Sequence, residues 1–326
     1  MGSSVWAVVS EDTDPHFNLA LEGHLLDSVS NGDRVLFLYR NRDSVVVGRH
    51  QNPWIECDLH RMKRDGVLLA RRQSGGGAVF HDLGNTNYSL LSTRADYDQD
   101  AGFDMVLAAL RGLSLPVERN ERNDLVAAGR KFSGSAFRHR RGRSFQHGTL
   151  LIDADLERLV RYLAAPKRAI AAKGTESVRS GVVNLSELDG RVTHSAVCDA
   201  LIDSFTRRFA SAPIAVHRIS RRTAPKFVRE ASHELRSWEW LFGKTPDFEH
   251  RVASPLGWTA TLHVHRGVID DVSVEASDPT DSEITAVLAS LVGCRYESGA
   301  LCRRLGERAS RQRAVVLCKI LEEEIP

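Results

Sequence analysis

The chain has 326 residues, of which 42% are hydrophobic and 26% are charged, and its formal net charge is +2. This length is enough for a large core and predicts two domains. The small net charge excludes a strongly polybasic nucleic-acid binder, and no apolar run is long enough to cross a bilayer, so we expect no nucleic-acid or membrane partner. Five widely spaced cysteines without a Cys-x-x-Cys pair are typical of a reducing compartment, and the first residues lack the pattern of a secretory signal.

The N-terminal third is predicted to contain short strands and helices in turn. Residues 5–10 form the first expected strand, after which Asp14 and Pro15 begin a helix as N-cap and first-turn residue. Apolar residues recur every four positions from Phe17 to Val29, which gives this helix a core face. Further strands are expected at 35–39, 44–47, 67–70, 78–80 and 87–91, and a short helix at 58–64.

The rest of the chain continues with groups of strands separated by helices. Helices are expected at 103–113, 155–163, 193–209, 281–291 and 303–321, with short strands between 117 and 152 and a strand pair at 258–264 and 268–274. Because strands and helices do not alternate strictly, the predicted fold class is α+β, with a mixed, mostly antiparallel sheet packed with helices. Residues 246–256 predict a linker between a catalytic domain at 1–245 and a small α+β domain at 257–326.

The most informative segment contains three consecutive glycines, Gly75–Gly77, which follow Arg71 and Arg72 and precede an apolar run. Glycine loses the most backbone entropy on ordering, so three in a row indicate that the backbone must approach a ligand closely or adopt positive φ. The exposed N–H groups of such a loop can surround an anion, and the two arginines add positive charge. The alternative is a simple glycine bulge in a sheet.

A second segment contains Lys131, within Gly-Arg-Lys-Phe-Ser-Gly-Ser at 129–135. Lysine is scarce in this chain, with seven residues in all, so one placed in a glycine- and serine-rich turn is suggestive. An ammonium group is a compact point charge that fits between a carboxylate and a phosphate. The alternative is a solvated lysine at the tip of a hairpin.

Two further segments complete the pattern. Residues 147–151 predict a strand that begins with His147 and Gly148. Residues 173–184 have two glycines, small polar residues and no helical period, which predicts a mobile loop of the kind that closes over a ligand.

Together these segments resemble the lipoate–protein ligases. The resemblance runs from about residue 5 to at least residue 245, and it also includes Asp-Pro-His-Phe-Asn-Leu-Ala at 14–20 and Gly-Arg-His-Gln-Asn-Pro-Trp at 48–54. Its main motifs are Arg-Arg-x-Ser-Gly-Gly-Gly-Ala-Val-Phe-His-Asp-x-Gly-Asn at 71–85, Arg-Asn-Asp-Leu at 122–125, Gly-Arg-Lys-Phe-Ser-Gly-Ser-Ala-Phe-Arg at 129–138, His-Gly-Thr-Leu-Leu at 147–151 and Lys-Gly-x-x-Ser-Val-Arg-Ser at 173–180.

The resemblance implies a biotin/lipoate ligase-like fold, with an accessory domain that moves during the cycle, and an ATP-dependent reaction. Free lipoate attacks the α-phosphate to give lipoyl-AMP, and a lysine of an acceptor domain then takes the lipoyl group. It implies ATP and Mg²⁺ with lipoate as substrate, and as acceptors the lipoyl domains of E2 subunits and the H protein. We expect a monomer in the cytoplasm, with the mitochondrial matrix as the alternative.

The same resemblance implies the site residues. Lys131 is the expected catalytic residue, bridging the acyl oxygen and the α-phosphate. The loop that holds the lipoyl group and the adenylate phosphate contains Arg71, Arg72, Ser74, Gly75, Gly76 and Gly77. The nucleotide side is lined by Ala78, Val79, Phe80 and Asn85. Asp124 and His147 orient ligand or metal, with Asp124 as the candidate metal ligand. The other implied binding residues are His81, Ser133, Arg138, Gly148, Lys173, Ser177, Val178, Arg179 and Ser180, of which Arg138 and the loop 173–184 cover the adenylate.

Two other functions fit part of the pattern. One is an ATP-independent lipoyl or octanoyl transferase between carrier proteins, and the other is a non-catalytic lipoate-binding protein. The loop 173–184, Lys131 and the Arg71-Arg72 pair favour the ligase over both. A biotin ligase is disfavoured because its Gly-Arg-Gly-Arg-x-Gly-Arg motif is missing.

A basic cluster lies close to these motifs. Residues 138–143 read Arg-His-Arg-Arg-Gly-Arg. This cluster is either a solvated hairpin tip or a docking surface for an acidic acceptor domain.

Overall fold

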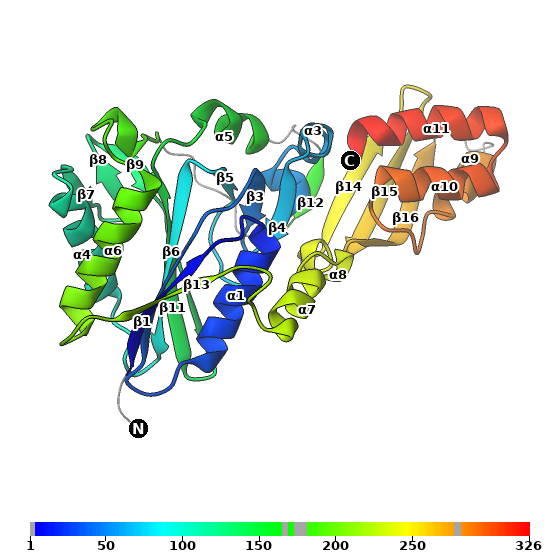
Figure 1. Ribbon diagram of the computed structural model, residues 1–326. Coiled ribbons are helices and arrows are strands. Elements are labelled where there is room, and N and C mark those ends of the chain that lie inside the picture. The colour runs from blue at the N-terminus through cyan, green and yellow to red at the C-terminus, as the bar shows by residue number, and fades with distance from the viewer. Residues whose placement is uncertain (1–3, 165–168, 173–180, 277–281) are drawn as a thin grey trace.

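The computed structural model describes residues 4–164, 169–172, 181–276 and 282–326 (Figure 1). Its largest element is a six-stranded sheet in the order β10-β11-β6-β2-β1-β13. The neighbours β1–β2 and β1–β13 are parallel, and the other three pairs are antiparallel. This arrangement confirms the mixed, mostly antiparallel sheet. The strands are β1 Val5–Ser10, β2 Arg34–Tyr39, β6 Asn85–Thr93, β10 Ser135–Arg140, β11 Arg143–Leu151 and β13 Ala215–Ile219.

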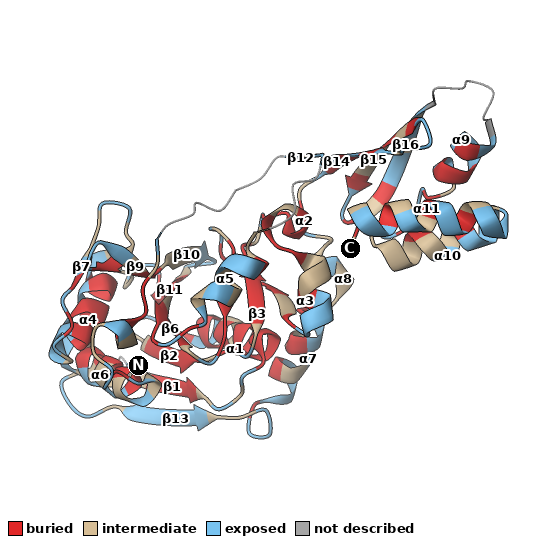
Figure 2. Ribbon diagram, turned by 90° about the horizontal axis from the view of Figure 1, so that it is seen from above, coloured by how far each residue is buried: buried red, intermediate tan, exposed pale blue. Residues whose placement is uncertain are grey.

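Helices cover both faces of this sheet (Figure 1). On β2, Val35 and Phe37 pack with α1 (Pro15–Ser28) and α7 (Lys226–Glu234) in one core. Leu36 and Leu38 point the other way, into a second core with α4 (Gln99–Gly112) and α6 (His194–Phe209). Because both faces are buried, the strand is a continuous apolar run and not an alternating one. The central strands are accordingly among the most buried elements in Figure 2.

Two three-stranded sheets lie beside the large one. The first has the order β4-β3-β5, and the second has the order β7-β8-β9. The turn between β8 and β9 uses positive φ at Ala128 (48°) and Gly129 (71°), which suits a tight hairpin. Lys131 therefore lies in β9 and not in the turn itself. Bounds are β3 Ser44–Val47, β4 Leu68–Arg71, β5 Val79–His81, β7 Val117–Arg119, β8 Leu125–Ala127, β9 Arg130–Ser133, α2 Pro53–Glu56, α3 Leu59–Asp65, α5 Leu156–Tyr162 and the 3₁₀ helix η1 Leu185–Glu187.

The C-terminal part is a small α+β domain, as expected. Its antiparallel sheet has the order β12-β14-β15-β16, and its core also includes side chains of three helices. The bounds are β12 Ile170–Ala172, β14 Phe248–Ala253, β15 Trp258–His265, β16 Val268–Ala276, α9 Ser282–Ala289, α10 Ser298–Arg308 and α11 Arg311–Glu324.

Two expectations for this part are wrong. Residues 248–253, within the expected linker 246–256, form β14, whose alternate side chains are buried in the core of the C-terminal domain. The single helix expected at 303–321 is two helices, because the backbone is extended at Ala309 and Ser310 and α11 begins there anew. The end of the catalytic domain at residue 245 stays a prediction.

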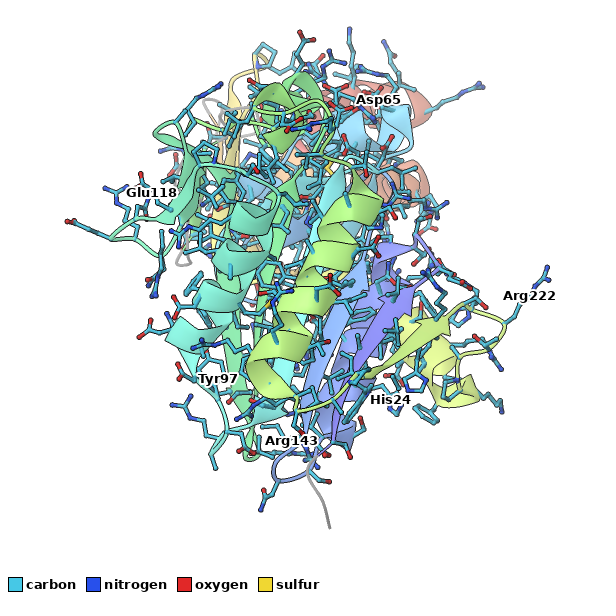
Figure 3. All side chains as sticks on the ribbon, turned by 60° about the vertical axis from the view of Figure 1, so that its left-hand side comes forward. His24, Asp65, Tyr97, Glu118, Arg143 and Arg222 are labelled. Atoms are coloured by element: carbon cyan, nitrogen blue, oxygen red, sulfur yellow. The ribbon has the colours of Figure 1, made fainter. Side chains whose placement is uncertain are left out.

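Aromatic side chains connect the two parts of the molecule. Trp54 of α2 is buried and packs against Phe242, Phe248 and Tyr296, with ring centroids 4.9–5.2 Å away. Phe242 directly follows α8 (Trp238–Leu241), which leads into the C-terminal domain. Charged side chains cover the outside, such as Glu118 and Arg222, which project from opposite sides in Figure 3. No helix in the described part of the chain is long and apolar enough to span a membrane.

Candidate active site

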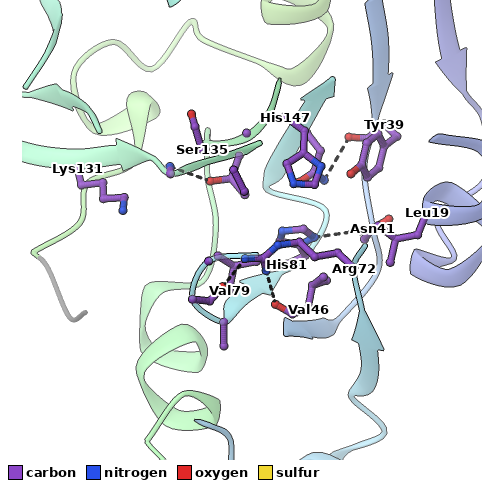
Figure 4. A pocket seen from close by; sticks show the side chains of 18 residues that line it. Leu19, Tyr39, Asn41, Val46, Arg72, Val79, His81, Lys131, Ser135 and His147 are labelled. Carbon is purple, nitrogen blue, oxygen red and sulfur yellow. Dashed lines mark hydrogen bonds between the residues drawn. The ribbon is translucent and has the colours of Figure 1, made fainter. Parts of the chain in front are cut away.

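A cavity of about 360 Å³ lies between the large sheet, the β4-β3-β5 sheet and β9 (Figure 4). Its walls join the sequence segments that were singled out as separate motifs. Lys131 lies at one side of the cavity, and Leu19, Tyr39 and Asn41 lie at the opposite side (Figure 4). Nine of the expected site residues line it: Arg72, Gly76, Gly77, Ala78, Val79, His81, Lys131, His147 and Gly148.

The glycine segment forms the loop between β4 and β5. Gly76 has a φ of +90°, and a Cβ there would lie 2.9 Å from Nη2 of Arg72. A Cβ on Gly48 would lie 2.1 Å from the carbonyl oxygen of Gly76, so the neighbouring loop also needs a glycine. A Cβ on Gly75 would meet no atom within 4 Å. The segment therefore needs glycine at position 76, both for backbone conformation and for space.

Arg72 stabilises the glycine loop through hydrogen bonds. Its Nη2 donates to the carbonyl oxygens of Gly75 and Gly77 at 2.7 and 2.8 Å, and its Nε donates to the Ser74 hydroxyl at 3.1 Å. Burial lowers the pKa of Arg72 to about 10, with Tyr39 and Glu22 acting in the opposite direction. The guanidinium therefore stays charged at neutral pH while it shapes the cavity wall.

Arg71 is not among the residues that line the cavity. Its Nη1 donates to the carbonyl oxygens of Gly48, Arg49 and Gln51 at 2.8–3.1 Å. Its Nε and Nη2 donate to the carbonyl oxygen of Leu241, and Nη2 also donates to the Thr245 hydroxyl. Arg71 thus ties the loop at 48–51 to the segment after α8, and its donors are occupied by protein atoms.

Lys131 is held by an ion pair. Its Nζ lies 2.7 Å from Oδ1 of Asp124, and both side chains are partly exposed, at 27% and 21%. The Lys131 backbone also pairs with the chain beyond residue 180: its N–H donates to the Gly181 carbonyl oxygen at 2.9 Å, and its carbonyl accepts from the Val183 N–H at 3.0 Å. One ammonium group is therefore fixed at the cavity wall, where it can meet an anion.

His147 links the loop to the interior of the large sheet. Its Nε2 lies 2.8 Å from the Ser74 hydroxyl, and its Nδ1 lies 2.9 Å from Oε1 of Glu22 on α1. Glu22 is buried and also accepts from the Ser89 hydroxyl. This chain of contacts fixes the orientation of the imidazole ring at the wall of the cavity.

Side chains alternate between the two faces of β5, so Val79, Phe80 and His81 do not all line the cavity. Val79 and His81 line the cavity, whereas Phe80 faces the opposite side and packs against Tyr162 with ring centroids 5.5 Å apart. Successive side chains of a strand point to opposite faces, so Phe80 has no access to the cavity from this position. Its expected nucleotide contact is not favoured by this geometry.

Several other expected residues lie outside the cavity lining. Ser74 stands behind it, bonded to Arg72 and His147, while Asp124 reaches it through Lys131. Arg138 on β10 is half-buried, and burial lowers its pKa, with the charges of Arg140 and Arg49 adding to the effect. The remaining residues of this group are Gly75, Asn85 and Ser133. Lys173, Ser177, Val178, Arg179 and Ser180 lie outside the described residues.

Nine lining residues were not predicted. Leu19, Gly134, Ser135, Ala136 and Thr149 fall within motifs of the resemblance, so the motif boundaries were a usable signal. Tyr39, Asn41, Val46 and Asn87 carry no motif. Tyr39, Val46 and Asn87 reach the cavity through the pairing of β2 with β6 and of β3 with β5, and Asn41 lies in the loop between β2 and β3. Sequence periodicity alone does not identify such residues.

A metal ion finds no ready-made site among the described residues. No group of three or more His, Cys, Asp or Glu side chains is arranged to hold one there. Asp124, the candidate ligand, is engaged by Lys131.

A comparison with protein-family models identifies the family of the chain. Residues 14–206 match the family model described as lipoyl protein ligase A/B catalytic domain. The chain belongs to this family. All 18 lining residues of the cavity lie within the matched range.

Solved structures of lipoate ligases are similar over most of the chain. The P. falciparum LipL1 in complex with lipoate is 28% identical, with a TM-score of 0.66 over 98% of this chain and 100% of that chain. Lipoate-protein ligase A bound with ATP is 28% identical, with a TM-score of 0.59 over 74% and 98%. A bipartite ligase and its E2 lipoyl domain from Thermoplasma acidophilum is 26% identical, with a TM-score of 0.61 over 74% and 96%. The lipoate ligase fold and the C-terminal domain are thus confirmed.

Proposed function

We propose that this protein activates free lipoate with ATP to lipoyl-AMP and then transfers the lipoyl group to a lysine of an acceptor lipoyl domain. The observation that carries the proposal is the placement of Lys131. Its ammonium, paired with Asp124, lies at one side of a cavity of about 360 Å³ whose other walls include the glycine loop. Relatives of this chain have been solved with lipoate and with ATP, which supports both substrates.

The chemistry needs positive charge in a fixed position. Lipoate attacks through a carboxylate oxygen and must approach the negatively charged α-phosphate, so charge repulsion dominates the barrier. Lys131 would lie between the two anions and stabilise the charge that develops, with Asp124 as the residue that positions it. The Gly76–Gly77 backbone would allow the phosphate to come close. Pyrophosphate leaves in this step, and the acceptor amine then attacks the acyl carbon and releases AMP.

The other walls of the cavity would hold the acyl chain. Leu19, Val46 and Val79 supply apolar surface. Arg72 donates its hydrogen bonds to the glycine loop and would not form an ion pair with the ligand. Mg²⁺ would neutralise the phosphates of ATP and of the leaving pyrophosphate. We assign Arg71 to the hydrogen bonds that join residues 48–51 to Leu241 and Thr245, and Phe80 to packing. We keep Arg138 and the loop 173–184 as proposed cover of the adenylate.

The acceptors we propose are lipoyl domains of E2 subunits and the H protein. A similar ligase structure includes its E2 lipoyl domain, which supports the first of these. The cytoplasmic location and the monomeric state remain predictions from the sequence.

The test is to incubate the protein with ATP, Mg²⁺, lipoate and a lipoyl domain, and to weigh the acceptor. We expect a mass increase of one lipoyl group that requires ATP. Transfer from a lipoylated or octanoylated donor protein without ATP would instead identify a transferase. Lipoate binding without any acceptor modification would identify a non-catalytic binding protein.

A further inference from the structure

Three buried side chains form a hydrogen-bonded chain that ends at the cavity wall. Asn18, Asn41 and His81 are 0%, 1% and 4% exposed. Nδ2 of Asn18 lies 2.9 Å from Oδ1 of Asn41, and Nδ2 of Asn41 lies 2.9 Å from Nδ1 of His81. Asn41 and His81 line the cavity, whereas Asn18 lies behind them at the start of α1.

The direction of each hydrogen bond in this chain is fixed by its first member. Nδ2 of Asn18 also faces the backbone carbonyl oxygens of Asp12 and Arg40, at 3.0 and 3.1 Å, so its two hydrogens are shared among three oxygens, and the carbonyl oxygens can only accept. The amide of Asn18 is therefore oriented with its nitrogen toward Asn41, which must present its own oxygen in return. The nitrogen of Asn41 then faces His81 and can only donate.

This arrangement determines the tautomer of His81. Nδ1 must accept from Asn41, so the ring proton resides on Nε2. Burial lowers the pKa of His81 to about 3, and the charges of Arg72 and His147 add to the effect, so the ring is neutral at physiological pH. Nε2 is buried and has no hydrogen-bond partner in the described part of the chain. His81, whose side chain lines the cavity, therefore carries an N–H donor on Nε2 that no group in the described part of the chain accepts.

We propose that the Nε2–H group of His81 donates to a sulfur of the lipoyl dithiolane ring and so selects lipoate over octanoate, the acid without the sulfurs. This inference rests on the proposed function, which puts the carboxylate at Lys131. Lys131 and Asn41 lie at opposite sides of the cavity, and His81 bonds to Asn41 (Figure 4), so His81 would meet the distal part of the acyl chain.

The physical basis of the selection is an unpaired donor. Sulfur is a weak acceptor, but it is an acceptor, whereas a saturated chain leaves the buried N–H without a partner. Leaving a buried donor unsatisfied disfavours the analogue that lacks the acceptor. We expect a preference for lipoate of roughly tenfold in Kd from this contact. Asn41 and Asn18 are positioning residues, because they act only through the tautomer of His81.

Two measurements test the inference. The first is ¹⁵N NMR of the imidazole nitrogens, which should show the proton on Nε2 of His81 in the intact protein and a mixture of tautomers in Asn41→Leu. The second is calorimetric Kd for lipoate and octanoate. We expect the lipoate preference to fall roughly tenfold in His81→Leu. His81→Gln should keep the preference, because a glutamine amide can supply the same donor, and His217→Leu on the exposed strand β13 is the control.

The outcomes separate this inference from the proposed function. A proton on Nδ1 of His81, or an unchanged preference in a folded His81→Leu protein, would overturn the inference. If lipoate is preferred and His81→Leu removes the preference while no ATP-dependent lipoyl transfer occurs, the inference stands and the proposed function fails. If His81→Leu does not fold, the variants His81→Gln and Asn41→Leu decide the question. A full preference for lipoate in His81→Gln together with a reduced preference in Asn41→Leu supports the inference. Any other combination of these two results contradicts it.

Discussion

Lys131 carries the positive charge on which the proposed chemistry depends. Because its side chain is partly exposed and, within the described residues, forms an ion pair with Asp124, it contributes little to packing. We expect Lys131→Ala to lower the rate of lipoyl-AMP formation by about 10²–10³ while the protein melts at nearly the same temperature. The control is Lys226→Ala on α7, an exposed lysine paired with Glu230. Full adenylation by a folded Lys131→Ala protein would contradict the mechanism.

Gly76 and Gly75 offer a matched pair of substitutions. Gly76→Val adds strain at a φ of +90° and displaces the Arg72 guanidinium, so we expect loss of lipoate binding and a destabilisation of about 1–3 kcal/mol. Gly75→Ala meets open space and should leave binding and stability nearly unchanged. Calorimetry with lipoate and thermal melts measure both effects. Unchanged lipoate affinity in Gly76→Val would mean that the glycines form only a bulge in the sheet.

Residue types alone do not predict which side chains face the cavity. Lys131, Gly76 and His147 come from three separate motifs and line one cavity, whereas their chemical roles stay predictions. The neighbours Arg71 and Arg72 are indistinguishable in sequence, yet Arg72 lines the cavity, whereas Arg71 does not line it and donates to carbonyl oxygens of residues 48–51 and of Leu241. Which side a strand residue faces depends on sheet pairing, and that is a property of the whole fold.

At the scale of elements, the N-terminus of α1 is a pH-dependent anchor. Asp14 caps the helix by accepting from the His16 and Phe17 N–H groups, and its carboxylate pairs with Arg236 near α8. Burial alone would raise the pKa of Asp14, but hydrogen bonds from His16, Phe17 and Arg236 outweigh it and hold the pKa well below its usual value. The native state therefore favours the ionised form.

This anchor predicts a loss of stability in acid. A depressed carboxyl pKa contributes stability above the ordinary value of about 4, and the contribution disappears as the pH falls through the native pKa. Asp14→Asn should be less stable than the natural protein by about 2 kcal/mol at pH 7, and the difference should shrink below pH 4. Denaturant titrations at several pH values measure this difference. A difference that stays constant with pH would show that Asp14 acts only as a neutral cap.

The β10–β11 hairpin gives a second prediction at this scale. Its tip has positive φ at Arg141 (49°) and Gly142 (75°), and Arg143 is engaged, since its Nε donates to the Val29 carbonyl oxygen at 3.0 Å. The exposed Arg140 and Arg141 are therefore the candidates for docking an acidic acceptor. We expect the pair Arg140→Ser and Arg141→Asn to raise the apparent KM for the lipoyl domain and to flatten its salt dependence.

The control for the hairpin is Arg222→Ser, at another exposed position (Figure 3). Adenylation from free lipoate should be unaffected in both proteins, because neither arginine of the pair lines the cavity. Equal loss in both half-reactions would place the hairpin in the adenylation site. An unchanged KM would leave the hairpin tip as solvated surface.

Long, well-capped elements were predictable from sequence. The helix begun by Asp14 and the helix ending at Phe209 occur almost where expected, because caps and apolar periodicity act locally. The start of α4 at Gln99 was missed, although Asp98 caps it. β14 was mistaken for a linker because Pro246, Ser254 and Pro255 flank it, and its pairing with β12 and β15 cannot be read from local sequence.

At the scale of the whole molecule, the cavity forms where separate segments of the chain come together. Its walls come from segments between residues 19 and 149, and neither the large sheet nor the small β4-β3-β5 sheet forms it alone. The family and the mixed fold could be predicted because several specific motifs lie in a fixed order along the chain. The contacts that close the structure could not, such as Trp54 in the core of the C-terminal domain, because they join residues distant in sequence.

The central claim is that this cavity forms lipoyl-AMP from free lipoate. The most direct measurement is exchange of radiolabelled pyrophosphate into ATP, which reports adenylate formation without any acceptor protein. We predict exchange that requires free lipoate, is retained in Lys226→Ala and is nearly abolished in Lys131→Ala. Absence of lipoate-dependent exchange in the natural protein, under conditions where a lipoyl domain still becomes lipoylated without ATP, would contradict the account.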